Sequence, residues 1–231
     1  MSIWILFIGT LLLSLWATAR VKSVYRRHSQ GVVVSGLTGG EAAYEILRRA
    51  GVPDVQITHQ DGLLGDHYDP VRRRLVLSTE NFYGRSPAAL GVAAHECGHA
   101  IQQQLAYKPL TWRMAAVGIT TYANYVVMIF PFLGLVTGLI RNWVVMASIM
   151  AAAWGVIMLF NLITLPVEFD ASRRAKEVLS NLGMIAPGDE AAAVRQVLDA
   201  AAWTYVAAFV TSLAYLLWHL LPLLLGGRTR D

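Results

Sequence analysis

Four long stretches without a charged residue constrain the fold of this chain more than any other feature. They cover residues 1–19, 114–140, 142–167 and 200–227. Each reaches or exceeds the roughly 18–20 residues that an α-helix needs to cross a bilayer. Charged residues make up only 15% of the chain, whereas soluble domains carry about 25%. The sequence therefore predicts a mainly α-helical membrane protein with about four transmembrane helices in contact with the lipid bilayer.

The first apolar stretch allows two interpretations. Ala17-Thr18-Ala19 has the form of a signal-peptide cleavage site after an apolar segment. No Lys or Arg precedes the stretch, however, and four basic residues follow it: Arg20, Lys22, Arg26 and Arg27. Because basic flanks tend to stay in the cytoplasm, this asymmetry favours an uncleaved anchor with its N-terminus outside. We therefore expect a multi-pass protein of the inner cell membrane whose first polar segment faces the cytoplasm.

Two polar segments, residues 20–113 and 168–199, lie between these stretches. In the first, Thr38-Gly39-Gly40-Glu41 has the spacing of a helix capping box, so a short helix is expected to run to Ala50. The pattern then predicts two short strands and a further helix: Val55–Thr58, Leu75–Ser78, and a helix that Ser86-Pro87 opens and that runs to about Leu105. The segment thus has the composition of a small α+β domain.

The last of these helices contains His95-Glu96-Cys97-Gly98-His99, an H-E-x-x-H pattern. On a helix the i, i+4 spacing places both imidazoles on one face, where they can hold one Zn²⁺. Glu96 is placed to act as a general base toward a water that the metal activates. A helix whose histidines only pack or form hydrogen bonds would show the same letters. The small residues around the pattern favour the metal site, because they let a substrate or another helix come close.

A catalytic zinc site needs a third protein ligand. Cys97 is a poor candidate, because at i+2 from His95 it points to the opposite face of the helix, and we expect it to be a small buried residue. His219, in the last apolar stretch, is expected to hydrogen-bond to a neighbouring helix or to cap the interface. Glu168 ends the third apolar stretch, and two membrane crossings separate it from His99. Both therefore emerge on the same side of the bilayer, and Glu168 is the strongest candidate.

The residues around Glu168 carry a family resemblance. Residues 168–175, EFDASRRA, resemble the E-x-x-A-D-x-x-A segment that supplies the third zinc ligand in the HtpX and CAAX prenyl protease superfamily. The whole chain resembles more closely the bacterial YugP-like membrane zinc metallopeptidases. The stretches that carry this resemblance lie between residues 38 and 175: TGGEAA at 38–43, GVPDV at 51–55, DHYDP at 66–70, AHECGHAIQ at 94–102 and EFDAS at 168–172.

This resemblance implies a zinc metallopeptidase of the gluzincin type, with a zincin-like catalytic domain and one Zn²⁺ per chain. Carried over residue by residue, it gives His95, His99 and Glu168 as metal ligands and Glu96 as the catalytic base. One position departs from the HtpX pattern: Ser172 stands where those proteins have an acid that supports a ligand histidine. Ser172, Asp170 or another group must take over this support.

The reaction also needs a donor for the developing oxyanion, and four residues are candidates: His67, Tyr68, Tyr83 and Arg173. The DHYDP segment at 66–70 is as compatible with a turn leading into the next strand as with a catalytic role. The strand at Leu75–Ser78 could present an edge to which an extended peptide adds. Arg72, Arg73 and Arg74 would then contact substrate or lipid headgroups, although a solvated basic face explains them equally.

Three functions follow from these features. The leading hypothesis is a membrane-anchored zinc endopeptidase that acts on polypeptides, including membrane or misfolded proteins. A site-2-type intramembrane protease is the first alternative, but Ser86-Pro87 and the glutamines at 102–104 make the motif helix look soluble or interfacial. A non-catalytic scaffold or chaperone stabilised by zinc is the second, although such a site needs no base at Glu96. The net charge of +4 is spread along the chain, so no nucleic-acid partner is indicated.

Overall fold

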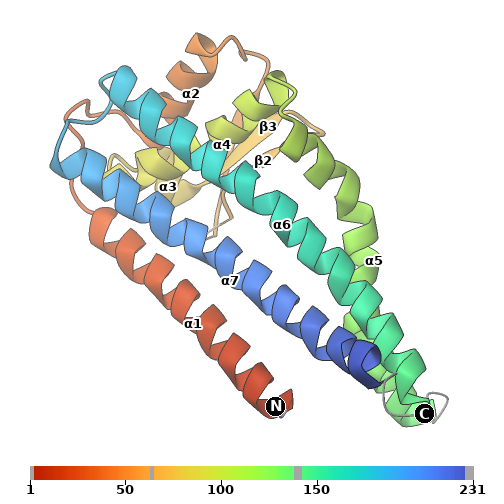
Figure 1. Ribbon diagram of the computed structural model, residues 1–231. Coiled ribbons are helices and arrows are strands. Elements are labelled where there is room, and N and C mark those ends of the chain that lie inside the picture. The colour runs from red at the N-terminus through yellow and green to blue at the C-terminus, as the bar shows by residue number, and fades with distance from the viewer. Residues whose placement is uncertain (1–2, 63–64, 138–141, 227–231) are drawn as a thin grey trace. The chain divides into compact units, whose positions relative to one another are not determined.

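The computed structural model describes residues 3–62, 65–137 and 142–226, and the fold is mainly helical (Figure 1). In chain order the elements are α1 (Ile3–His28), α2 (Gly39–Arg49), β1 (Gln56–Gln60), β2 (His67–Asp69), β3 (Arg74–Ser78), α3 (Thr79–Tyr83), α4 (Pro87–Gln104), α5 (Lys108–Thr137), α6 (Trp143–Asn181) and α7 (Asp189–Leu225). The outer limits of three predicted stretches, at Met1, Ile140 and Gly227, lie outside the described residues.

Four helices, α1, α5, α6 and α7, are long and apolar enough to cross a membrane, as the sequence predicted. Their large apolar side chains are widely exposed; Trp4 is 69% and Leu135 is 83% accessible. Exposed apolar surface of this extent marks a contact with lipid or with another protein.

Polarity changes along these helices without ending them. α6 runs without a break from the apolar residues after Trp143 to Asn181, and so passes Glu168 well inside the helix. Residues 167–181 contain no helix breaker, and Pro166 is accommodated within the helix. Gly183, with a φ of +63°, follows the helix end, where a residue in the left-handed conformation commonly terminates a helix. The chain around Glu168 is therefore helical rather than a loop after a membrane span.

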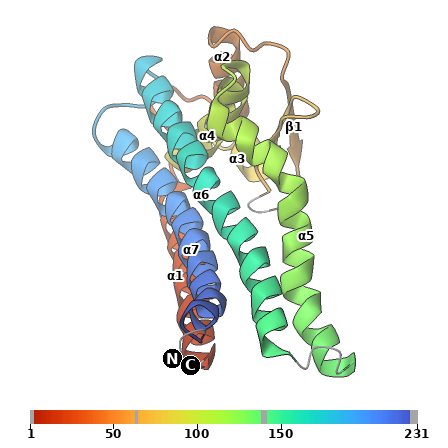
Figure 2. The same ribbon diagram turned by 45° about the vertical axis from the view of Figure 1, so that its right-hand side comes forward.

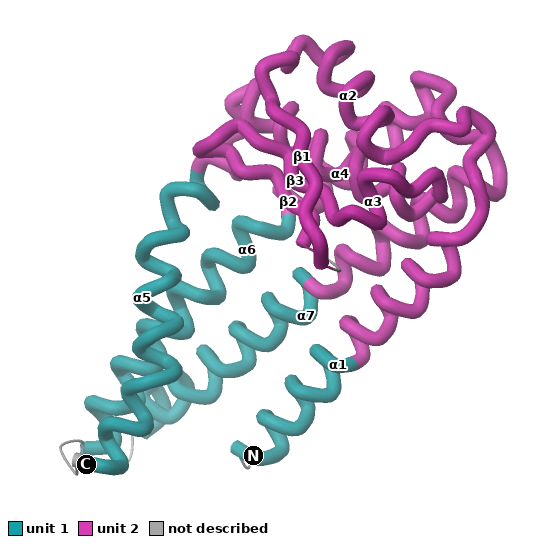
Figure 3. The backbone as a smooth tube through the Cα atoms, turned by 180° about the vertical axis from the view of Figure 1, so that it is seen from behind, with its two compact units in different colours: residues 1–15, 112–165, 205–231 teal, residues 16–111, 166–204 magenta. Residues whose placement is uncertain are grey.

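The chain forms two compact units, coloured separately in Figure 3. The first comprises Met1–Leu15, Trp112–Leu165 and Tyr205–Asp231. Within it, α5 and α6 lie side by side (Figure 2). Ala123 of α5 packs with Ala153 and Ile157 of α6. Trp154 stacks on Tyr215 of α7 with ring centroids 4.5 Å apart. The amide of Asn161 donates to the Ala208 carbonyl and to the Ser212 hydroxyl, at 3.2 and 3.0 Å. Such polar contacts commonly join helices within a membrane.

The second unit comprises Trp16–Thr111 and Pro166–Thr204 and contains the three-stranded sheet, ordered β1-β3-β2. β3 pairs with β1 in parallel and with β2 in antiparallel orientation. The expectation that the Leu75–Ser78 strand offers an edge to a peptide is therefore wrong, because β3 is the central strand. The two edges of the sheet belong to β1 and β2. Strand order depends on long-range packing, which the local pattern of residues does not contain.

Capping residues define where the helices around this sheet begin. Thr38 caps α2 in a complete capping box with Glu41. Ser86 caps α4, and Pro87 occupies its first turn. α4 is buried along most of its length, and its small residues Ala93, Ala94 and Ala100 are fully buried. The core of the unit joins α2, α4, the sheet and the polar parts of α6 and α7.

Candidate metal centre

α4 and α6 approach each other closely at Gly98, in the middle of the H-E-x-x-H pattern. A Cβ atom at this position would lie 2.8 Å from the carbonyl oxygen and 3.1 Å from the Cα of Ala171. Any side chain larger than that of glycine would push the two helices apart. The absence of a side chain at Gly98 thus lets the α6 backbone reach the helix that carries both histidines.

This approach brings Glu168 of α6 against His95 and His99 of α4. The Glu168 Oε2 atom lies 3.2 Å from Nε2 of His95 and 3.6 Å from Nε2 of His99. One ligand atom from each residue can be chosen so that all three lie within 4.8 Å of one another. The Glu168 side chain is 2% accessible, and the two imidazoles are 12% and 11% accessible. The three side chains thus form a shielded cluster of electron-pair donors.

The spacing of these atoms fits a zinc ion. Bonds of about 2.0–2.1 Å at tetrahedral angles place two ligand atoms on one zinc roughly 3.3 Å apart. The two nitrogen–oxygen distances, 3.2 and 3.6 Å, bracket this value. Two imidazoles and one carboxylate are also the donor set of one class of catalytic zinc sites. The residues present therefore fit the metal that the sequence implies.

The Nδ1 atom of each histidine has a partner on the side away from Glu168. The Ser172 hydroxyl oxygen lies 3.1 Å from Nδ1 of His95. The Gln102 side-chain oxygen lies 3.1 Å from Nδ1 of His99. These contacts orient both rings with Nε2 toward Glu168. Ser172 is one of the residues that the sequence predicted for this support, whereas the role of Gln102 was not predicted. Its position three residues after His99, on the same helix face, was the available signal.

The pKa of His99 is set by its burial and by its contacts with Glu168 and Gln102. Burial lowers the pKa of this imidazole, but the hydrogen bond and the charge of Glu168 together raise it more. The charge of Glu96 and the hydrogen bond to Gln102 add to this increase, so the pKa lies above its usual value. Because only a neutral imidazole binds a metal, protons and a metal ion compete for His99.

Glu96 is buried, with 8% of its surface accessible. Gln103 lies seven residues further along α4 and so shares its face of the helix. The Gln103 amide accepts a hydrogen bond from the Tyr68 hydroxyl and donates one to the Pro70 carbonyl. β2, which contains Tyr68, is therefore bound to α4 on the side where Glu96 projects.

Other histidines and the cysteine lie apart from this cluster. Cys97 is fully buried, with its thiol 3.7 Å from the Ala43 carbonyl of α2, which confirms that it is a packing residue. Burial raises the pKa of this thiol well above its usual value. Nδ1 of His219 hydrogen-bonds to the Tyr215 carbonyl in its own helix, so the expected bond to a neighbouring helix is not the one observed.

The four candidate oxyanion donors are all engaged elsewhere. Tyr68 binds Gln103, and the Tyr83 hydroxyl lies 3.3 Å from Nε2 of His59. Nδ1 of His67 contacts the Gly65 carbonyl at 2.7 Å. Arg173 binds Asp170 and Glu177 on its own helix. None of these contacts singles out one residue as the donor.

The DHYDP segment at 66–70 has a structural role in this fold. The Asp66 carboxylate accepts hydrogen bonds from the Ser78 backbone and from the Asn81 amide, at 2.7 and 2.9 Å. Asn81 in turn accepts from the Tyr25 hydroxyl of α1 at 2.7 Å. The Asp69 carboxylate accepts from two backbone N–H groups of the turn that follows. These bonds fix residues 66–72, which include β2, beside the end of β3 and join them to α1.

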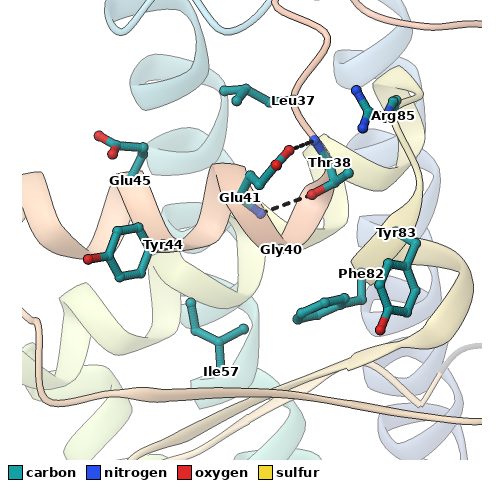
Figure 4. A pocket seen from close by; sticks show the side chains of 10 residues that line it. All are labelled: Leu37, Thr38, Gly40, Glu41, Tyr44, Glu45, Ile57, Phe82, Tyr83 and Arg85. Atoms are coloured by element: carbon teal, nitrogen blue, oxygen red, sulfur yellow. Dashed lines mark hydrogen bonds between the residues drawn. The ribbon is translucent and has the colours of Figure 1, made fainter.

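A concave site in this unit is separate from the metal cluster (Figure 4). Its volume is about 660 Å³, and Leu37, Tyr44, Ile57, Phe82 and Tyr83 supply most of its apolar lining. Thr38 and Glu41 also line it, and the dashed lines in Figure 4 mark the two capping-box hydrogen bonds between them. None of the three clustered ligand residues lines it.

Comparison with known proteins identifies the family. The chain matches the family described as "Putative neutral zinc metallopeptidase" over residues 3–224. It is 41% identical over 226 residues to the "Putative membrane protease YugP" of Bacillus subtilis (strain 168), and the match covers 98% of each protein. No solved structure matches the chain. The chain belongs to this neutral zinc metallopeptidase family and is a YugP-like protein.

Proposed function

We propose that this protein is a membrane-anchored zinc metalloendopeptidase that hydrolyses peptide bonds of membrane or misfolded proteins. His95, His99 and Glu168 bind one Zn²⁺, and Glu96 is the general base. The observation that carries this proposal is the shielded cluster of two imidazoles and one carboxylate at zinc-ligand spacing, with a buried glutamate next to His95 in the chain. The β-sheet, α4 and the polar part of α6 then form a zincin-like catalytic domain.

When bound, zinc supplies a Lewis acid that polarises the scissile carbonyl and activates a water molecule. The carboxylate of Glu96 takes a proton from this water and later gives it to the leaving amine. Ser172 and Gln102 hold the two imidazoles in place. We expect the substrate backbone to lie on the β2 side of α4, because Gln103 binds β2 on the face that Glu96 shares.

We propose four membrane crossings with the N-terminus outside, a topology in which the catalytic residues face the cytoplasm. A reporter fused after Asp231 should then be extracytoplasmic, and one inserted near Gly62 should be cytoplasmic. The opposite pair of results would invert this topology. The ligand cluster itself does not depend on the orientation.

Activity is tested by comparing the wild type with Glu96→Gln, a variant of nearly equal shape. Both are purified, their zinc content is measured by mass spectrometry, and both are incubated with casein as an unfolded substrate. We expect equal zinc and cleavage by the wild type alone. Equal and negligible cleavage by both proteins at full zinc occupancy, repeated over many substrates, would refute the protease and favour the zinc-stabilised scaffold.

The ligand assignment has its own test. Glu168→Ala should lower zinc content, because it removes one of three ligands. Unchanged stoichiometry and affinity would show that Glu168 is not a ligand. The site-2-type alternative receives less support, because α4 is buried among α2, the sheet and α6 and is not one of the four helices apolar enough to cross a membrane.

A further inference from the structure

Gln102 is a fully buried amide at the contact between α4 and α6. Its Nε2 group donates one hydrogen bond to the Val167 carbonyl at 2.8 Å and one to the Asp170 carboxylate at 3.0 Å. Its Oε1 atom faces Nδ1 of His99 at 3.1 Å. Both amide hydrogens are therefore used on α6, and the oxygen is left for the histidine.

The chemistry of these partners fixes which way the amide points. A backbone carbonyl can only accept a hydrogen bond, and so can an ionised carboxylate. Arg173 and Arg174 both donate to Asp170, which keeps it in the ionised form. The NH₂ group of Gln102 must therefore face α6. Its oxygen must face His99, and an oxygen acceptor requires the proton of the neutral imidazole to be on Nδ1.

We propose that Gln102 is a positioning residue of the metal centre, which fixes His99 in the Nδ1–H form, and that Asp170 acts on His99 through Gln102. This inference rests on the zinc site of the proposed function. In this tautomer Nε2 keeps its lone pair on the side of Glu168, where the ligand cluster would hold the zinc ion. A carboxylate commonly contacts the ligand histidine directly in zinc sites. Here the Gln102 side chain lies between the Asp170 carboxylate and His99, and its neutral amide contacts the imidazole.

The two histidines are supported in different ways. The Ser172 hydroxyl that contacts His95 can either donate or accept, so it permits both tautomers of that ring. Gln102 permits only one tautomer of His99. Without the amide, the Glu168 carboxylate, 3.6 Å from Nε2, would draw the His99 proton to Nε2 for part of the time, and in that form His99 cannot bind a metal through Nε2. Zinc affinity should fall for this reason even where the fold is intact.

The test compares Gln102→Met with Gln103→Met in the full-length protein in detergent micelles. Gln103 is a matched control on the same helix, since its amide also donates to a backbone carbonyl, that of Pro70, and accepts from a side chain, the Tyr68 hydroxyl of β2, but neither partner is a proposed zinc ligand. Zinc affinity is measured by competition with a chromophoric chelator. The histidine tautomers of the zinc-free protein are measured by ¹⁵N NMR at a pH where the imidazoles are neutral.

We expect Gln102→Met to bind zinc ~10–100-fold more weakly, the range found when outer-shell partners are removed. We expect Gln103→Met to keep the affinity of the wild type. The NMR signals of His99 should show Nδ1–H in the wild type and a mixture of tautomers in Gln102→Met. Equal affinities in both variants, or an unchanged His99 tautomer in Gln102→Met, would reduce Gln102 to a structural role and overturn the proposal.

Asp170→Ala tests the second half of the proposal and remains informative if Gln102→Met does not fold. On its own, it should weaken zinc binding and give a mixture of His99 tautomers. Combined with Gln102→Met, it should cause no further loss of zinc affinity. An Asp170→Ala protein with wild-type affinity and tautomer would exclude action through Gln102. None of these measurements depends on peptide cleavage. A wild type that binds zinc but cuts nothing would refute the protease and leave the tautomer result standing.

Discussion

The two faces of α4 are built on different principles. One face meets α6 and carries His95, His99 and Gln102, whose polar atoms each have a specific partner. The opposite face meets α2 and carries Cys97, which is fully buried and within a mainly apolar core. Hydrogen bonds between buried groups demand one partner at one distance, whereas apolar packing demands mainly the right volume. Substitutions on the α6 face should therefore affect zinc binding, whereas substitutions on the α2 face should affect stability alone.

Gly98→Leu should have the largest effect, because it removes the close approach on which the α6 face depends. The new side chain would meet the Ala171 backbone, which cannot move without shifting α6. We expect a loss of about 3 kcal/mol in the free energy of unfolding, at the upper end for overpacking, together with loss of bound zinc. Chemical denaturation and zinc analysis measure both quantities.

Gly118→Leu is the control for this prediction. Gly118 is also helical, and a Cβ there meets nothing within 4 Å. It should retain both zinc and stability. A Gly98→Leu protein with full zinc content and wild-type stability would contradict the close contact between α4 and α6.

Cys97→Ala probes the other face and should have a moderate effect. It removes one buried sulfur atom, a change comparable to deleting a methyl group, and should cost about 1 kcal/mol of stability. Zinc affinity should not change, because Cys97 contacts α2 and not the ligands. A clear loss of zinc affinity in a protein of nearly wild-type stability would mean that the two faces are coupled.

Glu41→Gln, on α2 behind the apolar face, should have the smallest effect and a characteristic pH dependence. Hydrogen bonding to the Thr38 backbone, and secondarily to its side chain, lowers the pKa of the Glu41 carboxyl below its usual value in the folded protein. Its contribution to stability is therefore complete above the usual glutamate pKa and is lost as the pH falls through the lowered value. The stability difference from the wild type, measured by denaturation, should shrink between neutral pH and pH ~3. A difference that grows on acidification would contradict this sign.

Local signals were sufficient for some features of this fold and not for others. The capping box at Thr38, the N-cap at Ser86 and the burial of Cys97 follow from short-range patterns, and the structure contains all three. The contact of Gln102 with Asp170 could not be predicted, because it depends on how α6 is rotated about its own axis. The central place of β3 could not be predicted either, because strand order is set by packing between distant segments.

The burial of Cys97 has a practical consequence for experiments on this protein. It is the only cysteine in the sequence, and a fully buried thiol with a raised pKa reacts slowly with alkylating reagents. A single cysteine introduced at an exposed position, such as Val71 with 84% accessibility, would therefore be the one fast-reacting thiol. The natural chain can thus serve as its own background for labelling with spin probes or fluorophores, without prior removal of a native cysteine.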